Sequence, residues 1–180
     1  MSHFDTGISV TAFSISHIVY MILIFGSITW LYLANKDKTM EQKIKVLRFL
    51  SYALVISYLS DFFVHDFVYG GMEIDKLPFH ICTILCPLCA IAQFNTKGHK
   101  IIEPVAILAI LAPMMYVCYP AAIGSGEPWC YKAVQTMFYH GVLLAWGILC
   151  FAFGYVKAEI KNSYKCAILL VCITLWAKFG

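Results

Sequence analysis

The chain alternates long apolar stretches with short polar connections. Five stretches are long enough to cross a bilayer, and a shorter sixth lies near the C-terminus. An α-helix rises ~1.5 Å per residue, so about 20 apolar residues cross the ~30 Å hydrocarbon core of a membrane. The pattern predicts an all-α integral membrane bundle of about six transmembrane helices. The predicted helices are Ile8–Ala34, Ile44–Tyr69, Leu77–Phe94, Ile101–Pro120, Ala133–Val156 and Tyr164–Ala177.

Composition supports a membrane protein over a soluble one. Hydrophobic residues make up 61% of the chain and charged residues only 13%, whereas soluble domains carry about 25% charged residues. The net charge of +3 is spread over the connections and forms no single basic patch, so we expect no nucleic-acid partner. The expected partners are membrane lipids. No linker or polar lobe divides the sequence, so residues 1–180 are expected to form one transmembrane domain.

The basic residues lie mainly on one side of the predicted membrane. The connections after the first, third and fifth helices, with the start of the second, hold ten of the 13 Lys and Arg residues. Positive residues stay on the cytoplasmic side of a membrane. The N-terminus is therefore predicted to lie outside.

The last apolar stretch is too short to cross. Tyr164–Ala177 would reach about 21 Å as a helix. We expect a chain whose C-terminal part is truncated, although a segment that lies at the interface or ends within the bundle would fit the same pattern.

Titratable side chains within the apolar stretches are the main functional signal. Such groups are costly in a membrane and mark functional sites by default. Six of them fall in the predicted outer half, about 5–15 Å deep, whereas Glu103 lies near the cytoplasmic surface and can snorkel. Interhelical hydrogen bonding without any chemistry is the alternative explanation. The six are His17, Asp61, His65, Asp66, His80 and His140.

Helical spacing indicates which of these groups can meet. Asp61 and His65 are four residues apart and share a helix face, as an imidazole and an orienting carboxylate would. His80 and Cys82 are two residues apart and point in different directions. A Cys82 dyad therefore needs a histidine from another helix, either His140 or His17.

Two further chemistries remain open on the sequence. Cys118 and Cys130 flank a predicted outer loop and could form a disulfide, and Cys86-Pro-Leu-Cys89 has the redox-active C-x-x-C spacing, although at mid-membrane depth. Zinc held by Asp61, His65, His80 and His140 with an open position for water would make a metal-dependent hydrolase. We expect no cofactor, with zinc as the less favoured alternative.

Three motifs carry a family resemblance. They are Phe13-Ser14-Ile15-Ser16-His17, Leu77-Pro78-Phe79-His80-Ile81-Cys82 and Phe138-Tyr139-His140-Gly141. In order and spacing they resemble the YwaF-like (TP0381-type) bacterial integral membrane proteins, a family with seven helices. The resemblance implies a multi-pass protein of the bacterial cell membrane.

A more distant resemblance extends to the transmembrane protein 164 acyltransferases and to the androgen-induced and androgen-dependent lipid hydrolases. These relatives imply acyl transfer or ester hydrolysis by a Cys or Thr nucleophile with a His. His80 and His140 match their histidine positions. In the acyltransferases the nucleophilic Cys is next to the third-helix His, where this chain has Phe79, and Cys82 lies two residues beyond His80.

Together these observations favour a lipid acyltransferase or hydrolase with a site in the outer half of the bilayer. His140 would be the general base and Cys82 or Thr83 the nucleophile, with His80 a second base or oxyanion donor. The substrate-binding candidates are His17, Asp61 and His65. A non-catalytic protein that transports or binds a small molecule is the competing class, because a polar pocket in a bundle suits a solute equally well.

Overall fold

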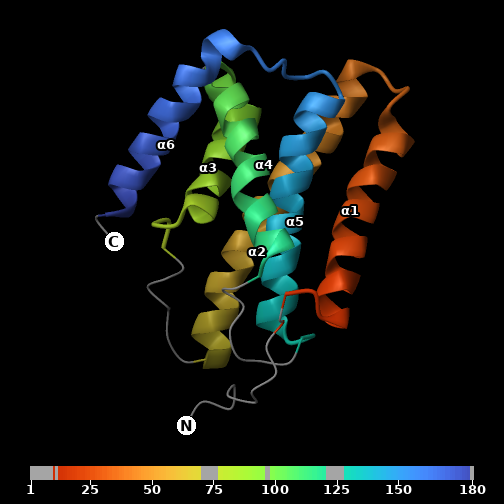
Figure 1. Ribbon diagram of the computed structural model, residues 1–180, viewed down its shortest axis with the longest axis vertical. Coiled ribbons are helices and arrows are strands. Elements are labelled where there is room, and N and C mark those ends of the chain that lie inside the picture. Colours follow the sequence, from red (N-terminus) through yellow and green to blue (C-terminus); the bar gives the residue numbers. More distant parts are fainter. Residues whose placement is uncertain (1–9, 11, 70–76, 96–97, 121–127, 179–180) are drawn as a thin grey trace.

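The computed structural model describes residues 10, 12–69, 77–95, 98–120 and 128–178, except the side chains of residues 65, 66, 68, 69, 98 and 99 (Figure 1). Every regular element in these ranges is helical, which confirms the predicted all-α bundle. The elements are α1 (Ile15–Asn35), α2 (Met40–Tyr69), α3 (Ile81–Phe94), η2 (Gly98–Ile101), α4 (Ile102–Cys118), α5 (Tyr131–Ala152), η3 (Ile160–Asn162) and α6 (Ser163–Ala177).

Four predicted helices are shorter than the apolar pattern suggested. The first begins at Ile15 and not at Ile8, and the fifth ends at Ala152 and not at Val156. The third begins at Ile81 and not at Leu77, and it has 14 residues, while the fourth has 17. Four helical segments in the described ranges are long and apolar enough to cross a membrane, and α3 and α4 are not among them. In α3 the difference arises because the apolar residues Leu77 and Phe79 precede the helix.

The last stretch differs in the opposite sense: η3 and α6 together give the 18 residues Ile160–Ala177, which are long and apolar enough to cross, so the expectation that this stretch is too short is wrong by length.

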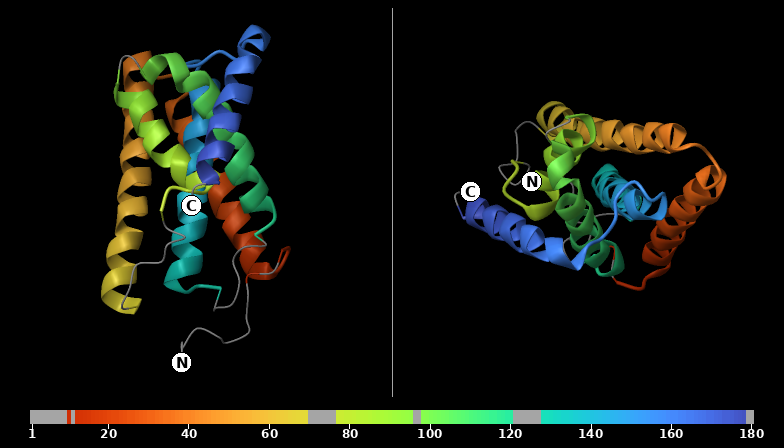
Figure 2. Two further views of the ribbon diagram at one scale, coloured as in Figure 1. Left: turned by 90° about the vertical axis from the view of Figure 1, so that its left-hand side faces the viewer. Right: turned by 90° about the horizontal axis from the view of Figure 1, so that it is seen from above.

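Helix α5 lies at the centre of the bundle (Figure 2). It packs against α1, α2 and α4, and 67% of its apolar window is buried, compared with 22% for α1. Trp146 and Leu143 of α5 are fully buried. Groups carried by α5 can therefore face three neighbouring helices.

The closest approach between α4 and α5 depends on Gly147. A Cβ at this position would lie 2.9 Å from the backbone oxygen of Ala106 and 2.9 Å from Cγ1 of Ile110. Only a residue without a side chain permits this distance between the two helices.

The three connections that carry most basic residues lie at one end of the bundle, the upper end in Figure 1. They are the turn between α1 and α2, η2, and the segment between α5 and α6. Both α3 and α6 extend from this end over only part of the height of the bundle, whereas α2 and α5 extend further toward the other end (Figure 2). The first turn of α3 therefore begins within the bundle.

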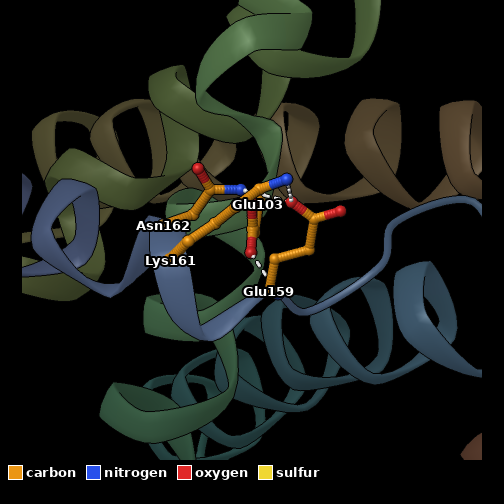
Figure 3. Close-up of polar contacts among 4 residues, drawn as sticks. All are labelled: Glu103, Glu159, Lys161 and Asn162. Atoms are coloured by element: carbon orange, nitrogen blue, oxygen red, sulfur yellow. Dashed lines mark hydrogen bonds and ion pairs between the residues drawn. The ribbon is translucent and has the colours of Figure 1, made fainter.

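Glu103 attaches the connection between α5 and α6 to the start of α4 (Figure 3). Its carboxylate accepts hydrogen bonds from the backbone N–H of Glu159, 2.8 Å, and from Nδ2 of Asn162, 2.7 Å. Lys161 forms an ion pair with Glu159 at 2.8 Å. The hydrogen bond and the charge of Lys161 lower the pKa of the Glu159 carboxyl below its usual value.

The far end of α6 is held beside the approach to α3. Trp176 Nε1 donates to the backbone oxygen of Pro78 at 2.8 Å, and its ring stacks on Phe79 with centroids 6.1 Å apart. The short last helix thus ends within the height of the bundle, next to the residues that lead into α3.

All eight cysteines are free thiols. The disulfide considered between Cys118 and Cys130 is not formed. Cys118 Sγ lies 3.7 Å from the Met114 sulfur, one turn back on its own helix. Cys86 and Cys89 are buried in the core and are not joined either.

Candidate functional site

A cavity of about 350 Å³ lies at the first turn of α3, between α2, α4 and α5. Its volume is within the usual range for small-molecule sites. Tyrosine, amide and hydroxyl side chains contribute to its wall beside the titratable groups. The lining residues are Tyr58, Asp61, His80, Ile81, Cys82, Thr83, Tyr116, Gln135, Thr136, Tyr139 and His140.

Five of the seven residues that the sequence singled out line this cavity. Asp61 comes from α2 and His140 from α5, and both are buried, with 6% and 8% of their surface exposed. Cys82 and Thr83 are half-buried in the first turn of α3, and His80 is exposed just before it. Residues from three helices thus reach one space, but their chemical roles stay predictions.

The start of α3 is fixed by a local capping interaction. His80 is the N-cap residue, in an extended backbone conformation. Its N–H donates to Thr83 Oγ1 at 3.2 Å, and the Thr83 hydroxyl donates to the His80 carbonyl at 2.8 Å. Thr83 therefore uses its hydroxyl as both donor and acceptor to begin the helix.

The His140 ring is held in one orientation. Its Nδ1 lies 2.8 Å from the Thr136 carbonyl oxygen, and because a carbonyl only accepts, Nδ1 carries the proton. The Tyr116 ring of α4 stacks on the imidazole, with centroids 3.9 Å apart and planes 8° from parallel. The described residues give Nε2 no hydrogen-bond partner, so the lone pair of a neutral His140 is on the nitrogen that is available to a ligand.

Tyr139 connects α5 to the first turn of α3, which carries Cys82. Its hydroxyl donates to the carbonyl oxygen of Cys82 at 2.7 Å, and its ring meets that of His140 edge-on, with centroids 5.4 Å apart. One residue therefore fixes the Cys82 backbone relative to the neighbouring His140.

The structure places His17 apart from the residues that line the cavity. Its ring is fully buried, with Nε2 2.7 Å from the Val117 carbonyl and Nδ1 accepting from the Phe13 N–H at 2.9 Å. Both ring nitrogens are engaged, and the ring joins the start of α1 to the end of α4. Of the two histidines considered as partners for Cys82, His140 shares its cavity.

His65 lies on α2, but its side chain is outside the described part of the structure, as is that of Asp66. The predicted pairing of His65 with Asp61 therefore stays a prediction. Among the described residues, no three His, Cys, Asp or Glu side chains are grouped so that they could hold a metal ion. The zinc site that includes His65 falls outside that search.

Sequence reasoning missed the tyrosines and the polar neutral residues of the cavity. Tyr58, Tyr116 and Tyr139 count as apolar in a hydropathy pattern, so a search for charged groups passes over them. A search for titratable groups also passes over Gln135, although an amide in an apolar stretch is an equally specific signal. Gln135 donates from Nε2 to the Ser57 carbonyl of α2 at 3.2 Å.

Comparison with known families gives one result. The model of the TMEM164 family matches residues 12–179 of this chain. No curated protein and no solved structure matches it. The match spans the six α-helices of the described residues and, with their apolar character, shows a multi-pass membrane protein. The chain belongs to the TMEM164 family.

Proposed function

We propose that this protein is a lipid acyltransferase or lipid ester hydrolase that works through a Cys82–His140 pair. The observation that carries the proposal is the cavity in which a thiol from α3 and an oriented, buried imidazole from α5 share one wall. A thiol activated by an adjacent imidazole is a recurring nucleophile for acyl transfer. A membrane-embedded cavity gives it access to acyl lipids.

The proposed reaction has two steps. His140 Nε2 takes the proton of Cys82 Sγ as the sulfur attacks the ester carbonyl of a lipid. The C–O bond breaks, the proton passes from His140 to the departing alkoxide, and a thioester remains on Cys82. Water or the hydroxyl of an acceptor lipid then attacks the thioester. His140 takes the proton of that hydroxyl and returns it to the sulfur, which gives hydrolysis or transfer.

The contacts favour Cys82 over Thr83 as the nucleophile. The Thr83 hydroxyl already donates its proton to the His80 carbonyl and accepts from the His80 N–H. Its use as a nucleophile would break the cap of α3. The Cys82 carbonyl is fixed by Tyr139, and its thiol has no such capping role.

His80 and Asp61 would serve as supporting groups. His80 lies at the exposed edge of the cavity, where it can donate to an oxyanion or a headgroup, and Asp61 lies buried at the α2 wall. Within the family we place the chain with the YwaF-like (TP0381-type) proteins of the bacterial cell membrane, on the three motifs around His17, His80 and His140.

The test uses the full chain in lipid nanodiscs with a phospholipid whose acyl chain carries an alkyne tag. Wild-type protein should release or transfer the tagged chain and carry it on Cys82 as a hydroxylamine-sensitive thioester, seen by mass spectrometry. Cys82→Ala should abolish both signals. Cys172→Ala is the matched control, because Cys172 is exposed on α6, and it should leave both unchanged.

The histidine is tested by His140→Gln, which should slow turnover by about 10²–10⁴-fold, the usual contribution of a general base. Each variant should unfold near the wild-type temperature. Turnover that survives Cys82→Ala would overturn the nucleophile assignment. Absence of turnover and of thioester in wild-type protein would overturn the enzyme class and leave a small-molecule binder.

A further inference from the structure

Two apolar cavities lie on the other side of Gln135 from the polar one. The first, of about 490 Å³, lies between α2 and α5. The second, of about 560 Å³, extends from it between α1, α2 and α5. They adjoin along α5, and the two together are called here the α5 groove; the wall residues that they share are Phe49, Ala53, Val134 and Phe138.

Gln135 stands at the boundary between the α5 groove and the polar cavity. It lines both spaces and is held toward α2 by its bond to the Ser57 carbonyl. Among the described lining residues Gln135 is the one common to both spaces, so a molecule that extends from the α5 groove to the cavity of Cys82 and His140 would have to pass this side chain.

The deeper part of the α5 groove offers an apolar surface. No charged residue is among its described lining residues. Of its hydroxyls, Tyr20 donates to the Pro128 carbonyl at 2.6 Å and Ser27 donates to the Ile24 carbonyl at 2.8 Å. The polar groups of the wall are thus satisfied within the protein, and a hydrocarbon occupant would leave none of them without a partner.

The length of the α5 groove fits the hydrocarbon tail of a lipid. Along α5 the groove runs from Val134 to Ala145, about 16 Å, which is close to half of the ~30 Å hydrocarbon core. A hydrocarbon tail that enters from the outer leaflet can therefore lie along α5 in this groove.

We propose that the α5 groove is the acyl-chain site of the enzyme. The hydrocarbon tail of one lipid lies along α5 between α1 and α2, and its ester end enters the polar cavity past Gln135. This inference rests on the proposed function and adds where the substrate lies and which residues limit its length. Ala53, at the junction of the two cavities, would set how long a chain is accepted.

The first test does not depend on activity. Cys82→Ala protein is placed in phosphatidylethanolamine–phosphatidylglycerol nanodiscs with a trace of phospholipid that carries a diazirine at the end of one acyl chain, and labelled peptides are identified by mass spectrometry. Label should concentrate on groove residues such as Leu50, Met137 and Val142. It should exceed, several-fold, the label on the exposed α4 residues Leu111 and Met115.

Variants that fill the groove complete the test. Ala53→Trp, and independently Val134→Trp at the outer end, should reduce groove labelling several-fold and leave the α4 label unchanged. Ala167→Trp on the exposed side of α6 is the matched control and should change neither. In active protein, Ala53→Trp should shift turnover toward shorter acyl chains.

The outcomes separate the two proposals. Groove labelling that equals the α4 label and ignores both tryptophans would show boundary lipid only and overturn the acyl-chain site, whether or not the protein is an enzyme. Groove-specific labelling that the tryptophans block supports the site even where Cys82 proves dispensable. An unshifted chain-length preference in a folded, active Ala53→Trp protein would also overturn it.

Discussion

The ring of Tyr116 lies flat on the ring of His140, with centroids 3.9 Å apart and planes 8° from parallel. The two residues come from α4 and α5, so the stack links helix packing to the orientation of the candidate base. The Thr136 carbonyl fixes the same imidazole through Nδ1. Together these contacts determine which nitrogen is available and where it points.

Loss of the stack should slow the reaction more than it disturbs the fold. Aromatic pairs contribute about 0.5–1.5 kcal/mol beyond the area they bury, and about 1 kcal/mol at the transition state corresponds to about five-fold in rate. Tyr116→Ala should therefore lower turnover by about five-fold or more, whereas Tyr116→Phe, which keeps the ring, should stay near wild type. The measurement is tagged-lipid turnover in nanodiscs.

The control is Tyr119→Ala, because Tyr119 is an exposed tyrosine three residues further on, at the C-cap of α4. It should leave turnover unchanged. A Tyr116→Phe protein as slow as Tyr116→Ala would show that the hydroxyl matters and that the stack does not.

His17 should prove structural. Its removal in His17→Ala leaves the Val117 carbonyl without its partner, which costs about 1–3 kcal/mol, and it opens a void at a fully buried position. We expect a clearly lower unfolding temperature and nearly unchanged turnover per folded molecule. Thermal unfolding in detergent and the nanodisc assay measure the two separately.

The neighbouring Ile18→Ala is the comparison, since Ile18 is exposed and its truncation should cost little. If His17→Ala abolished turnover while the unfolding temperature stayed at the wild-type value, the sequence-based assignment of His17 to the substrate site would be correct after all.

The sequence predicts the helices well because each apolar stretch and its polar ends are local features. The apolar pattern places the start of α3 too early because Leu77 and Phe79 are as apolar as the helix itself. What begins the helix is the bonding between His80 and Thr83, and a hydropathy pattern does not register a cap.

The cavity was harder to predict than the helices. Depth along each helix suggests that His80, Asp61 and His140 lie near one level, and all three line one cavity, but depth cannot say how each helix is rotated about its axis. His17 is predicted at a similar depth, yet its ring bonds to the Val117 carbonyl and does not line the cavity. Contacts such as Tyr139 to Cys82 arise only once α3 and α5 are packed.

The contacts of Glu103 should matter more than the ion pair beside them. Glu103→Ala removes two hydrogen bonds that hold the α5–α6 connection, so we expect a loss of about 1–3 kcal/mol and faster deuterium exchange of the Glu159 amide. Glu103→Gln keeps one acceptor oxygen, so its stability should lie between that of Glu103→Ala and that of wild-type protein. Lys161→Ala should produce no measurable change in stability, because its ion pair with Glu159 is exposed.

The pair of Glu159 with Lys161 also sets the sign of a pH effect. Because the folded pKa of Glu159 lies below its usual value, any stabilisation from the pair is present at neutral pH and is lost as the pH falls through the lowered pKa.

The outcome for Glu103 is read at the Glu159 amide. If this amide exchanges at the same rate in Glu103→Ala as in wild-type protein, the Glu103 carboxylate does not hold the connection between α5 and α6.

Gly147 should be the most sensitive glycine in the helices. In Gly147→Ala the new methyl group meets backbone atoms of α4, the Ala106 oxygen at 2.9 Å and the Ala109 carbonyl carbon at 3.0 Å. Backbone cannot rotate away as a side chain can, so α4 must move off α5, and overpacking of this kind costs about 1–3 kcal/mol. Because α4 carries Tyr116 and α5 carries His140, the same shift should loosen their stack and lower turnover.

Gly26→Ala is the matched control on α1. A methyl group there has no neighbouring atom within 4 Å, and alanine is the better helix former by up to ~1 kcal/mol. Its unfolding temperature and turnover should equal or slightly exceed the wild-type values. A Gly147→Ala protein as stable and as active as Gly26→Ala would mean that α4 and α5 do not approach each other this closely, and the orientation of His140 by Tyr116 would lose its structural basis.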